Sequence, residues 1–511
     1  MADGVAPLSI LLASSEVVGF AKTGGLADVC GYLPRALARR GHRCAVILPL
    51  YRSVRNGPIP IQPTDHYLSI AIRHQMLPAR LWRSKLPDSG VDVFLVEHGE
   101  LFERDDPSKG YGLYQMTLPD GRKQDYPDNC GRFVFFCRAV MEAIPHLGFA
   151  PDILHANDWQ TGLLPVYLRE LYQHRPGYEQ VRTLLTIHNI AYQGIFKSWE
   201  YALTGLNWRL FNHHQLEFYG QLNFLKAAIV FADWISTVSP TYAREICTSY
   251  FGYGLDGVLN ERRNRLSGIV NGVDYTTWNP ATDRRIAANY DVDSVREGKA
   301  VCKADLQRRF NLLQEPRIPV LGMIARLVEQ KGIDLALKAA DDLLRLGVQL
   351  IILGEGDPEY HARLTSLQQR YPHQVGLKLG FDEVLAHPIE SGADLYLMPS
   401  LFEPSGLNQL YSLKYGTIPV VRATGGLKDS VQEFDAEAGT GTGYLFEAYE
   451  GTALLQAIQR AVSAYAHEDQ WRVLMRNAMR ADYSWNESAR KYVALYYRLL
   501  GVEDRAATLV Q

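Results

Sequence analysis

The chain has 511 residues, of which 47% are hydrophobic and 21% are charged, values typical of a folded globular protein. This length exceeds what one hydrophobic core organises, so we expect two or three domains. The 53 basic and 56 acidic residues give a net charge of −3, and no basic stripe stands out. A disordered chain and a nucleic-acid-binding protein are therefore excluded.

The cysteines and the N-terminal residues indicate the compartment. The six cysteines form no CxxC pair and no zinc-like cluster with histidine, so we expect free thiols in a reducing compartment. The opening sequence, MADGVAPLSILLASSEV, has an apolar stretch but lacks the positively charged region of a signal peptide. No segment is long enough to span a membrane. We therefore expect a cytoplasmic (or organellar-matrix) protein without a membrane partner.

In the first half of the chain, short apolar runs alternate with amphipathic helical patterns. Leu26, Val29, Leu33 and Leu37, for example, recur at the spacing of one helix face. Alternation of this kind predicts parallel strands that are joined by helices. The predicted strands are residues 8–12, 44–48, 91–96, 153–155, 183–187 and 234–238, and the predicted helices are residues 26–40, 130–144, 161–172 and 222–231.

A second series of the same kind follows residues 269–272. The chain then ends in a helical pattern with one apolar face. We therefore predict two Rossmann-like domains, residues 1–268 and 269–485, and a terminal helix, residues 486–511, that packs back on the first domain. The predicted strands of the second series are residues 320–324, 348–353, 376–379, 395–398 and 419–421, and its helices include residues 334–346 and 358–370.

The predicted fold class is α/β, with two doubly wound domains that face each other across a cleft. The carboxyl ends of parallel strands meet at such a cleft, where folds of this kind bind their ligands. Pattern alone leaves a tandem dehydrogenase, a pair of periplasmic-binding-protein-like domains and a kinase as alternatives. The motifs at the strand ends must decide among them.

The first motif, KTGGL, spans Lys22 to Leu26, between the first predicted strand and the first predicted helix. Paired glycines let a ligand approach the backbone closely, and a helix N-terminus offers N–H groups to an anion. The motif matches neither the GxGxxG pattern nor the P-loop pattern. It is interpreted either as a phosphate-binding loop, to which Lys22 adds a cation, or as a tight turn that requires glycine.

The second motif, RLVEQKG, follows the predicted strand 320–324. It places Arg326 at the edge of the sheet and Lys331 at the start of the next helix. Two cations at that position can hold a diphosphate, Arg326 through its planar guanidinium and Lys331 as a point charge. The alternative is a pair of ordinary surface cations.

The third motif, PSLFEPSGLN, follows the predicted strand 395–398 and leads into a helix from about Asn408. The N–H groups of Leu407 and Asn408 lie at the helix N-terminus, which favours an anion. A diphosphate bound there would repel a carboxylate, so we expect Glu403 to face a sugar, whose hydroxyls donate to carboxylate oxygens. The alternative is that Glu403 caps nearby N–H groups.

Polar and aromatic residues also gather near strand ends of the first domain. HANDW, residues 155–159, follows one predicted strand, and His188 and Asn189 follow the next. Tyr111 lies in a Gly/Pro-rich loop before a helix. Such residues suit a sugar, because its hydroxyls need directional partners and its C–H faces stack on rings. A histidine at a strand end is alternatively a structural group whose hydrogen bonds are satisfied within the fold, and Asp158 alternatively caps the helix that follows.

Together the motifs resemble those of one enzyme family, the bacterial glycogen synthases and plant starch synthases. The resemblance implies a GT-B fold and the retaining transfer of glucose from ADP-glucose to the 4-hydroxyl at the non-reducing end of an α-1,4-glucan. It also implies that no metal or other cofactor is needed, that the first domain binds the glucan acceptor and that the second binds the nucleotide-sugar donor. The matching segments, in chain order between about residues 8 and 443, are KTGGLADV, HANDWQTGLLP, TIHNIAYQG, VNGVD, ARLVEQKG and PSLFEPSGLNQLYSLKYGTIPVVRATGGL.

By motif position, the resemblance assigns roles to individual residues. Arg326 and Lys331 would neutralise the diphosphate as it leaves. Phe381 would stack on the adenine ring, and Glu403 would bind hydroxyls of the donor glucose. The implied catalytic residues are Lys22, Asp158, His188, Arg326, Lys331 and Glu403. The implied donor-binding residues are Lys22, Gly25, Asp28, Asn271, Arg326, Lys331, Phe381, Ser405, Gly406, Leu407 and Asn408, and the implied acceptor or sugar-binding residues are Tyr111, Asp158, His188 and Asn189.

Some positions depart from the usual pattern. Ser405 stands where the family often has cysteine; it is small and polar and should keep the turn, but it leaves no thiol for a thiol-specific role. Tyr411 stands where related GT-B enzymes often carry a second glutamate, as expected for the bacterial glycogen synthase branch. Pro388 after His387 is unusual and has no physical explanation in the sequence.

No carboxylate in these motifs is an evident nucleophile, so the two-carboxylate route of retaining glycosidases is not predicted. A front-face substitution fits better, in which the leaving diphosphate accepts the proton of the attacking hydroxyl. One rival is a non-catalytic glucan-binding protein of the same fold, and the retained cations and Glu403 argue against it. The other is a different GT-B enzyme, such as a glucan phosphorylase or a sucrose-type synthase; no segment matches a pyridoxal-phosphate lysine. The motifs leave open the choice between ADP- and UDP-glucose and the oligomeric state.

Overall fold

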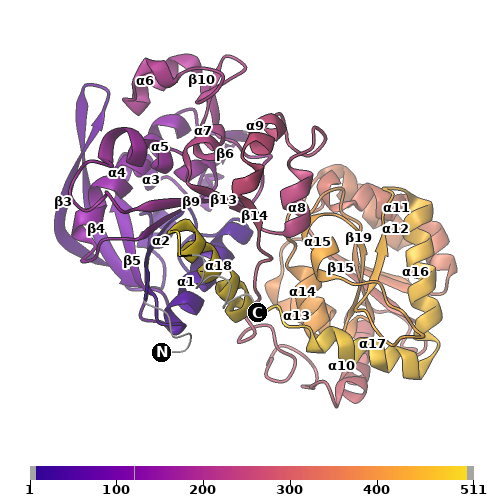
Figure 1. Cartoon of the computed structure of the whole chain (residues 1–511). Coiled ribbons are helices and arrows are strands. Elements are labelled where there is room, and N and C mark those ends of the chain that lie inside the picture. The colour runs from indigo at the N-terminus through magenta and orange to yellow at the C-terminus, as the bar shows by residue number, and fades with distance from the viewer. Residues whose placement is uncertain (1–6, 120, 503–511) are drawn as a thin grey trace. The chain divides into compact units, whose positions relative to one another are not determined.

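The computed structural model describes residues 7–119 and 121–502, and the chain divides into two compact units (Figure 1). The chain passes from the first unit to the second after Gly272, a few residues beyond the predicted boundary, and returns to the first unit at Trp485. Residues 503–511 of the predicted terminal helix lie outside the described residues. Unit 1 is formed by Met1–Val238, Ala243–Gly272 and Trp485–Gln511, and unit 2 by Ser239–Tyr242 and Val273–Ser484.

Unit 1 is built on a nine-stranded sheet with the order β14-β13-β9-β8-β1-β2-β5-β4-β3. The strands from β14 to β5 pair in parallel, as the strand–helix alternation predicts, and β4 and β3 add an antiparallel edge. The strands are β1 (Ser9–Ala13), β2 (Arg43–Pro49), β3 (Gln62–Ile72), β4 (Gln75–Lys85), β5 (Asp92–Glu97), β8 (Ile153–Asn157), β9 (Arg182–Ile187), β13 (Trp234–Thr237) and β14 (Leu266–Gly268).

The long hairpin of β3 and β4 is not among the predicted elements. Most of β3 is exposed, so it lacks the continuous apolar run that marks strands buried on both faces. β4 does carry a signal: Ala79 and Leu81 are buried, and the residues between and beside them are more exposed. That alternation is typical of a strand with one buried face and could have identified β4.

Two predicted helices of unit 1 differ from the structure. Residues 161–172 contain α5 (Leu164–Tyr167), which continues as a wider π-helical turn, Leu168–Tyr172. Residues 222–223 belong to a strand of a small antiparallel sheet with the order β10-β12-β11, so α7 starts later than predicted. The side chain of Asn223 accepts the N–H of Lys226 at 2.8 Å and caps α7.

The helices of unit 1 are connected by short strands and turns. The helices are α1 (Gly25–Arg39), α2 (Arg52–Arg55), α3 (Gly99–Phe102), α4 (Asn129–Ala143), α5, α6 (Tyr201–Thr204), α7 (Phe224–Phe231), α9 (Asp256–Glu261) and α18 (Trp485–Leu499), and α8 (Pro240–Glu245) precedes α9. The small strands are β6 (Gln115–Thr117), β7 (Lys123–Asp125), β10 (Ile195–Lys197), β11 (Glu217–Phe218) and β12 (Gln221–Asn223). These bounds place the predicted motif HANDW at the carboxyl end of β8, and KTGGL at the end of the connection from β1 into α1.

The terminal helix α18 packs against α1 and is anchored to the sheet through His155. Nδ1 of His155 lies 2.9 Å from the hydroxyl of Tyr496, and Nε2 lies 2.6 Å from Oγ1 of Thr186. Burial lowers the pKa of this imidazole to about 3, so the ring is neutral. His155 therefore lies inside β8 and has a structural role, which is one of the two roles that the sequence analysis leaves open for a histidine at a strand end.

Unit 2 holds a six-stranded parallel sheet with the order β17-β16-β15-β18-β19-β20. Every strand predicted in this half is present, and β20 is additional. The strands are β15 (Val320–Ile324), β16 (Gln349–Gly354), β17 (Val375–Leu379), β18 (Leu395–Met398), β19 (Ile418–Arg422) and β20 (Tyr444–Phe446). The helices are α10 (Val295–Arg309), α11 (Ile333–Arg345), α12 (Pro358–Arg370), α13 (Glu383–Gly392), α14 (Asn408–Lys414), α15 (Gly425–Ser430), α16 (Gly451–Tyr465) and α17 (Glu468–Arg480).

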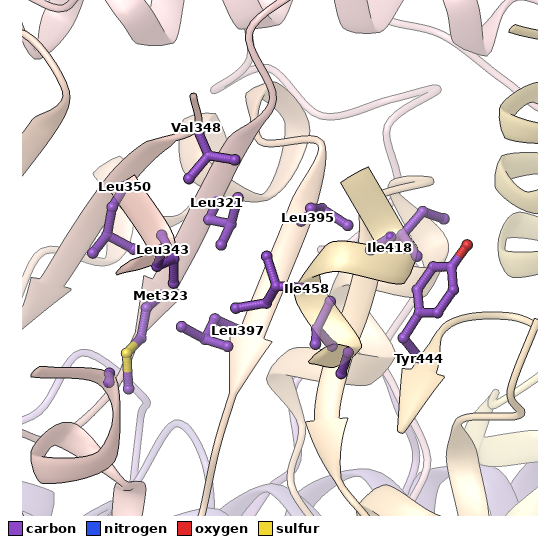
Figure 2. Close-up of a cluster of buried hydrophobic side chains, with 14 of the residues drawn as sticks. Leu321, Met323, Leu343, Val348, Leu350, Leu395, Leu397, Ile418, Tyr444 and Ile458 are labelled. Atoms are coloured by element: carbon purple, nitrogen blue, oxygen red, sulfur yellow. The ribbon is translucent and has the colours of Figure 1, made fainter. Parts of the chain in front are cut away.

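Successive side chains of β15 pack on opposite faces of this sheet. Leu321 and Met323 belong to the main core of unit 2, where Figure 2 shows them near Leu397 of β18 and Ile458 of α16. Val320 belongs to a second cluster, which α10 and α13 cover. The sheet is therefore buried on both faces, and the segments that leave its carboxyl edge start from a rigid base.

Candidate active site

In unit 1, the KTGGL motif forms the connection into α1 and is held by a carboxylate that the sequence analysis missed. Glu16 accepts the backbone N–H of Thr23, the hydroxyl of Thr23 at 2.6 Å and the N–H of Gly24 at 3.3 Å. The hydroxyl of Tyr114 also donates to Glu16, at 2.8 Å. Glu16 belongs to no recognisable sequence motif. The one sequence signal for its role is that an acidic residue lies close to the glycine loop.

The glycines of this loop are not required by the packing of the protein. A Cβ built on Gly24 or Gly25 would meet no atom within 4 Å. Gly24 has extended backbone angles, and no side chain caps the start of α1. The interpretation of the motif as a turn that needs glycine is therefore weakened, and open space beside a helix N-terminus is what a phosphate-binding loop requires. Lys22 is half-exposed, and its Nζ lies 2.7 Å from Oδ1 of Asp28, so the two predicted residues meet.

Asp158 and His188 also meet in unit 1, at the ends of β8 and β9. Oδ1 of Asp158 accepts the backbone N–H of His188 at 2.7 Å, and Nε2 of His188 lies 3.0 Å from Oδ1 of Asn157. Asp158 adopts φ 56° and ψ −174°, a conformation that is costly for a residue with a side chain. Its side chain makes no capping hydrogen bond to the turn that follows, so the interpretation of Asp158 as a helix cap is wrong.

The ionisation of this pair is shifted in opposite directions. Burial raises the pKa of the Asp158 carboxyl to about 7, the N–H groups of His188 and Asn189 lower it in part, and the charge of Glu16 raises it further. Burial lowers the pKa of the His188 imidazole to about 3, so that ring is neutral near pH 7. A strained, buried acid that titrates near neutrality is typical of a functional site.

Asp158→Asn is expected to stabilise the protein at high pH. The pKa of Asp158 is raised in the folded state, so its contribution to stability is fully present below its ordinary pKa and is lost as pH rises through about 7. Asparagine keeps the acceptor for the His188 N–H and stays neutral. The free energy of unfolding of the variant should exceed that of the wild type at pH 8.5 by up to about 4 kcal/mol, and by much less at pH 5. Urea unfolding at both pH values measures this, with Asp152→Asn as the control, because Asp152 precedes β8 and accepts the N–H of Ser9 at 2.7 Å. Equal differences at the two pH values would contradict the shifted ionisation.

In unit 2, Lys331 and Glu403 form a direct ion pair. Nζ of Lys331 lies 2.6 Å from Oε2 of Glu403, and the side chains are 19% and 7% exposed. The hydroxyl of Ser400 donates to the same oxygen at 3.2 Å. Arg326 is exposed and bonds Oε1 of Gln330 at 3.3 Å. Lys331 is thus paired with the predicted sugar-binding carboxylate, a contact that the sequence analysis did not predict, and the joint role of Arg326 and Lys331 toward a diphosphate stays a prediction.

This contact depends on Gly332, which has φ 73°. A Cβ at that position would lie 2.1 Å from the carbonyl oxygen of Pro399, so only glycine lets the turn before α11 approach the end of β18. β15 and β18 are neighbours in the sheet, and their two following segments therefore run side by side. The carbonyl of Glu403 in turn accepts the N–H of Gly426 at 3.0 Å, at the start of α15.

The remaining predicted donor-binding residues differ in whether their side chains already make structural contacts within the fold. The side chain of Asn408 donates to the carbonyl of Ile324 at 2.8 Å and to the hydroxyl of Tyr396 at 2.7 Å, so it joins strand ends. Gly406 has φ 69°, Ser405 is buried beside it, and Leu407 precedes α14 without a capping side chain. Phe381 follows β17, and its side chain is 85% exposed, so the ring is accessible to a ligand.

Three other predicted residues lie in unit 1. Asn271 was assigned to the donor domain, but it belongs to unit 1, where it is buried and its Oδ1 has no hydrogen-bond partner among the described residues. Asn189 accepts the N–H of Ala191 at 3.0 Å. Tyr111 is 38% exposed and lines an open pocket of about 300 Å³ with Arg104 and Tyr126.

Within residues 7–119 and 121–502, no group of three or more His, Cys, Asp or Glu side chains could hold a metal ion. The same part of the chain contains no helix that is both long and apolar enough to cross a membrane. All six cysteines are free thiols.

Two Rossmann-like units with cations, a carboxylate and glycine turns at their strand ends define a glycosyltransferase of the GT-B fold. The starch synthase catalytic domain family matches residues 9–261, and the glycosyl transferases group 1 family matches residues 306–477. The glycogen synthase of Syntrophotalea carbinolica is 44% identical over 489 residues, which are 96% of this chain and 98% of that protein. The chain belongs to the glycogen synthase and starch synthase family.

Further relatives agree with this assignment. The glycogen synthase of Anaeromyxobacter sp. (strain Fw109-5) is 45% identical over 492 residues, which are 96% of this chain and 99% of that protein. The catalytic domain of starch synthase IV from Arabidopsis thaliana, bound to ADP and acarbose, has a TM-score of 0.85 at 32% identity and covers 97% of this chain and 100% of that chain. The predicted resemblance, fold class and enzyme class are confirmed: the protein is a hexosyltransferase of the glycogen synthase type.

Proposed function

We propose that this enzyme transfers glucose from ADP-glucose to the 4-hydroxyl at the non-reducing end of an α-1,4-glucan, with retention of configuration. The ion pair of Lys331 and Glu403 carries the proposal, because it combines a cation for a leaving diphosphate with a carboxylate for sugar hydroxyls. The Arabidopsis starch synthase IV domain, which is bound to ADP and acarbose, supports the nucleotide and the glucan. The bacterial relatives, which are glycogen synthases, support an α-glucan as the product.

In the proposed reaction, the bond between C1 of the donor glucose and the diphosphate oxygen breaks, and O4 of the glucan attacks C1 from the same face. The departing diphosphate oxygen accepts the proton of the attacking hydroxyl, so that the products are ADP and a new α-1,4 linkage. Arg326 and Lys331 neutralise the charge that develops on the diphosphate. Glu403 binds hydroxyls of the donor glucose. When the donor is bound, Lys331 contacts both the Glu403 carboxylate and the diphosphate.

We assign the two residue clusters of unit 1 to the donor: one acts on the sugar, and the other binds the diphosphate. Asp158 and the carbonyl dipole of His188 stabilise the positive charge that develops at C1, since a buried carboxylate acts strongly in a site without water. Lys22 and the N–H groups at the start of α1 face the diphosphate. Tyr111 and Asn189 belong to the acceptor side, and Phe381 stacks on the adenine.

We further propose that the enzyme acts in the cytoplasm, with the nucleotide sugar and the glucan as its partners. Its six cysteines are free thiols, and a reducing compartment keeps them so. Five of them are buried, so oxidation would have to disturb the packing of the units that contain them.

The donor is tested by incubating the enzyme with glycogen and either ADP-glucose or UDP-glucose while the released nucleoside diphosphate is measured. We expect kcat/KM to favour ADP-glucose and the labelled glucose to appear in α-1,4 linkages. Release of ADP without incorporation of glucose would show a hydrolase. Higher kcat/KM with UDP-glucose would overturn the assignment of the donor.

The reaction is also proposed to need no metal, because Arg326 and Lys331 supply the positive charge that a divalent ion brings to a diphosphate. After dialysis against EDTA, the enzyme should keep its kcat within about twofold. Adding Mg²⁺ or Mn²⁺ to the dialysed enzyme is the control. Loss of activity that either ion restores would contradict the role given to the two side chains.

A further inference from the structure

We propose that four tyrosines of unit 1, Tyr192, Tyr219, Tyr250 and Tyr253, form a stacking surface for the glucan chain, here named the tyrosine platform. The inference rests on the proposed function for the identity of the polymer. It starts from the backbone: Tyr219 and Tyr253 have φ of 50° and 49°. This left-handed region is unfavourable for a bulky residue.

The turn at Tyr219 shows how unusual the residue is. Tyr219 and Gly220, with φ of 50° and 79°, form the two-residue connection between β11 and β12, in which Phe218 pairs with Gln221. Turns with two left-handed residues favour Asn-Gly or Asp-Gly, because short polar side chains tolerate this conformation. Tyr253 and Gly254, with φ of 49° and 81°, repeat the same combination. A strained tyrosine at both places indicates that the ring, rather than the turn, is what the position needs.

The two turns lie against each other. A Cβ built on Gly254 would come within 3.0 Å of Cζ of Phe218 and 3.7 Å of Cε2 of Tyr219. Nε2 of Gln193 donates to the carbonyl of Tyr253 at 3.1 Å, and Nδ2 of Asn223 donates to Oε1 of Gln193 at 2.7 Å. The small sheet, the loop after β9 and the loop before α9 are therefore joined into one surface.

The remaining two rings lie at the same place. Tyr192 directly precedes Gln193, whose side chain bonds the carbonyl of Tyr253 at 3.1 Å, and Tyr250 lies three residues before Tyr253 in the same loop. The four side chains are nevertheless exposed, Tyr192 by 56%, Tyr219 by 81%, Tyr250 by 71% and Tyr253 by 46%. Exposed rings gathered in this way mark a binding surface.

A glucan is the occupant that these observations favour. Tyrosine offers a flat apolar face for the C–H groups of a sugar and a hydroxyl for its O–H groups. The platform also continues from the candidate catalytic cluster within unit 1: Tyr192 donates its N–H to the carbonyl of Asn189 at 3.2 Å, and His188 directly precedes Asn189. A polymer whose end reacts beside His188 would extend its following residues over this surface.

Tyr219→Asn separates binding from folding, because asparagine suits the turn and lacks the ring. The full-length variant should have a Tm about 2–4 °C higher than the wild type. Its affinity for maltoheptaose, measured by calorimetry without donor, should be about fivefold to tenfold lower. In transfer assays, KM for maltoheptaose should rise by a similar factor while kcat is kept. Tyr67→Asn is the control, since Tyr67 is 68% exposed on β3, away from the platform.

The outcomes separate this inference from the proposed function. A wild-type enzyme that transfers no glucose from ADP-glucose or UDP-glucose to maltoheptaose would refute the proposed function itself. If the wild type transfers glucose but Tyr219→Asn binds maltoheptaose as tightly as the wild type, the platform does not hold the glucan. Unchanged binding together with a change from dimer to monomer in gel filtration would instead show a protein interface.

Discussion

Replacing Lys331 by alanine is expected to lower kcat by about 10²–10³-fold, because one preorganised charge at a developing anion is worth about 2.7–4 kcal/mol. The variant should also lose stability, since Glu403 is 7% exposed and would lose its cation. KM for the glucan should change little. Steady-state kinetics with saturating donor and thermal unfolding of the same preparations measure both effects.

The double variant Lys331→Ala/Glu403→Gln separates the two roles of the lysine. A neutral glutamine needs no counter-charge, so the double variant should regain most of the lost stability and remain inactive. Lys338→Ala is the control: this lysine lies on α11 and pairs with Asp334 at 3.2 Å, but it is 66% exposed. Recovery of kcat in the double variant, or a Lys331→Ala enzyme with near-normal kcat, would remove Lys331 from the reaction.

Replacing Glu403 by glutamine is expected to reduce transfer by about 10²-fold or more while ADP binding is kept. The carboxylate accepts charge-assisted hydrogen bonds from sugar hydroxyls, and an amide reproduces them only in part. Because the substitution also releases Lys331 from its ion pair, affinity for ADP should be equal to or higher than that of the wild type. Glu403→Asp should be impaired as well, since its shorter side chain withdraws the oxygens.

Calorimetric titration with ADP, Tm and turnover of each Glu403 variant decide this prediction. Glu433→Gln is the control, because Glu433 also pairs with a cation of unit 2, Arg460 at 3.0 Å, but is partly exposed. If Glu403→Gln lost ADP affinity and thermal stability in proportion to its activity, the carboxylate would be a structural partner of Lys331 and nothing more.

The positions of the candidate site residues along the chain could be predicted well. β15 and β18 are short apolar runs because both faces of a parallel sheet are buried, and the motifs with Lys331 and Glu403 directly follow those runs. The predicted bounds of both strands agree with the structure. β3 is largely exposed to solvent, so its sequence contains no comparable apolar run, and the strand was not predicted.

Contacts between distant residues could not be predicted in the same way. Lys331 and Glu403 are 72 residues apart, and they meet because β18 inserts next to β15 in the sheet order. Nothing local to either strand specifies that neighbour. For the same reason the sequence analysis grouped Lys331 only with Arg326, its neighbour along the chain, and did not predict its contact with Glu403, nor that His155 anchors α18 through Tyr496.

The amino-acid sequence by itself therefore determined the two α/β series, the strand ends that carry the motifs, and the enzyme family, because hydrophobic periodicity and long ordered motifs are local properties of the chain. Only the tertiary structure decided how the chemical groups are used. It bonds Lys331 to Glu403, holds Asp158 in a strained and buried position beside His188, and brings Tyr219 and Tyr253 together. Strand order, burial and backbone conformation set these contacts, and each of them depends on residues far away in the sequence.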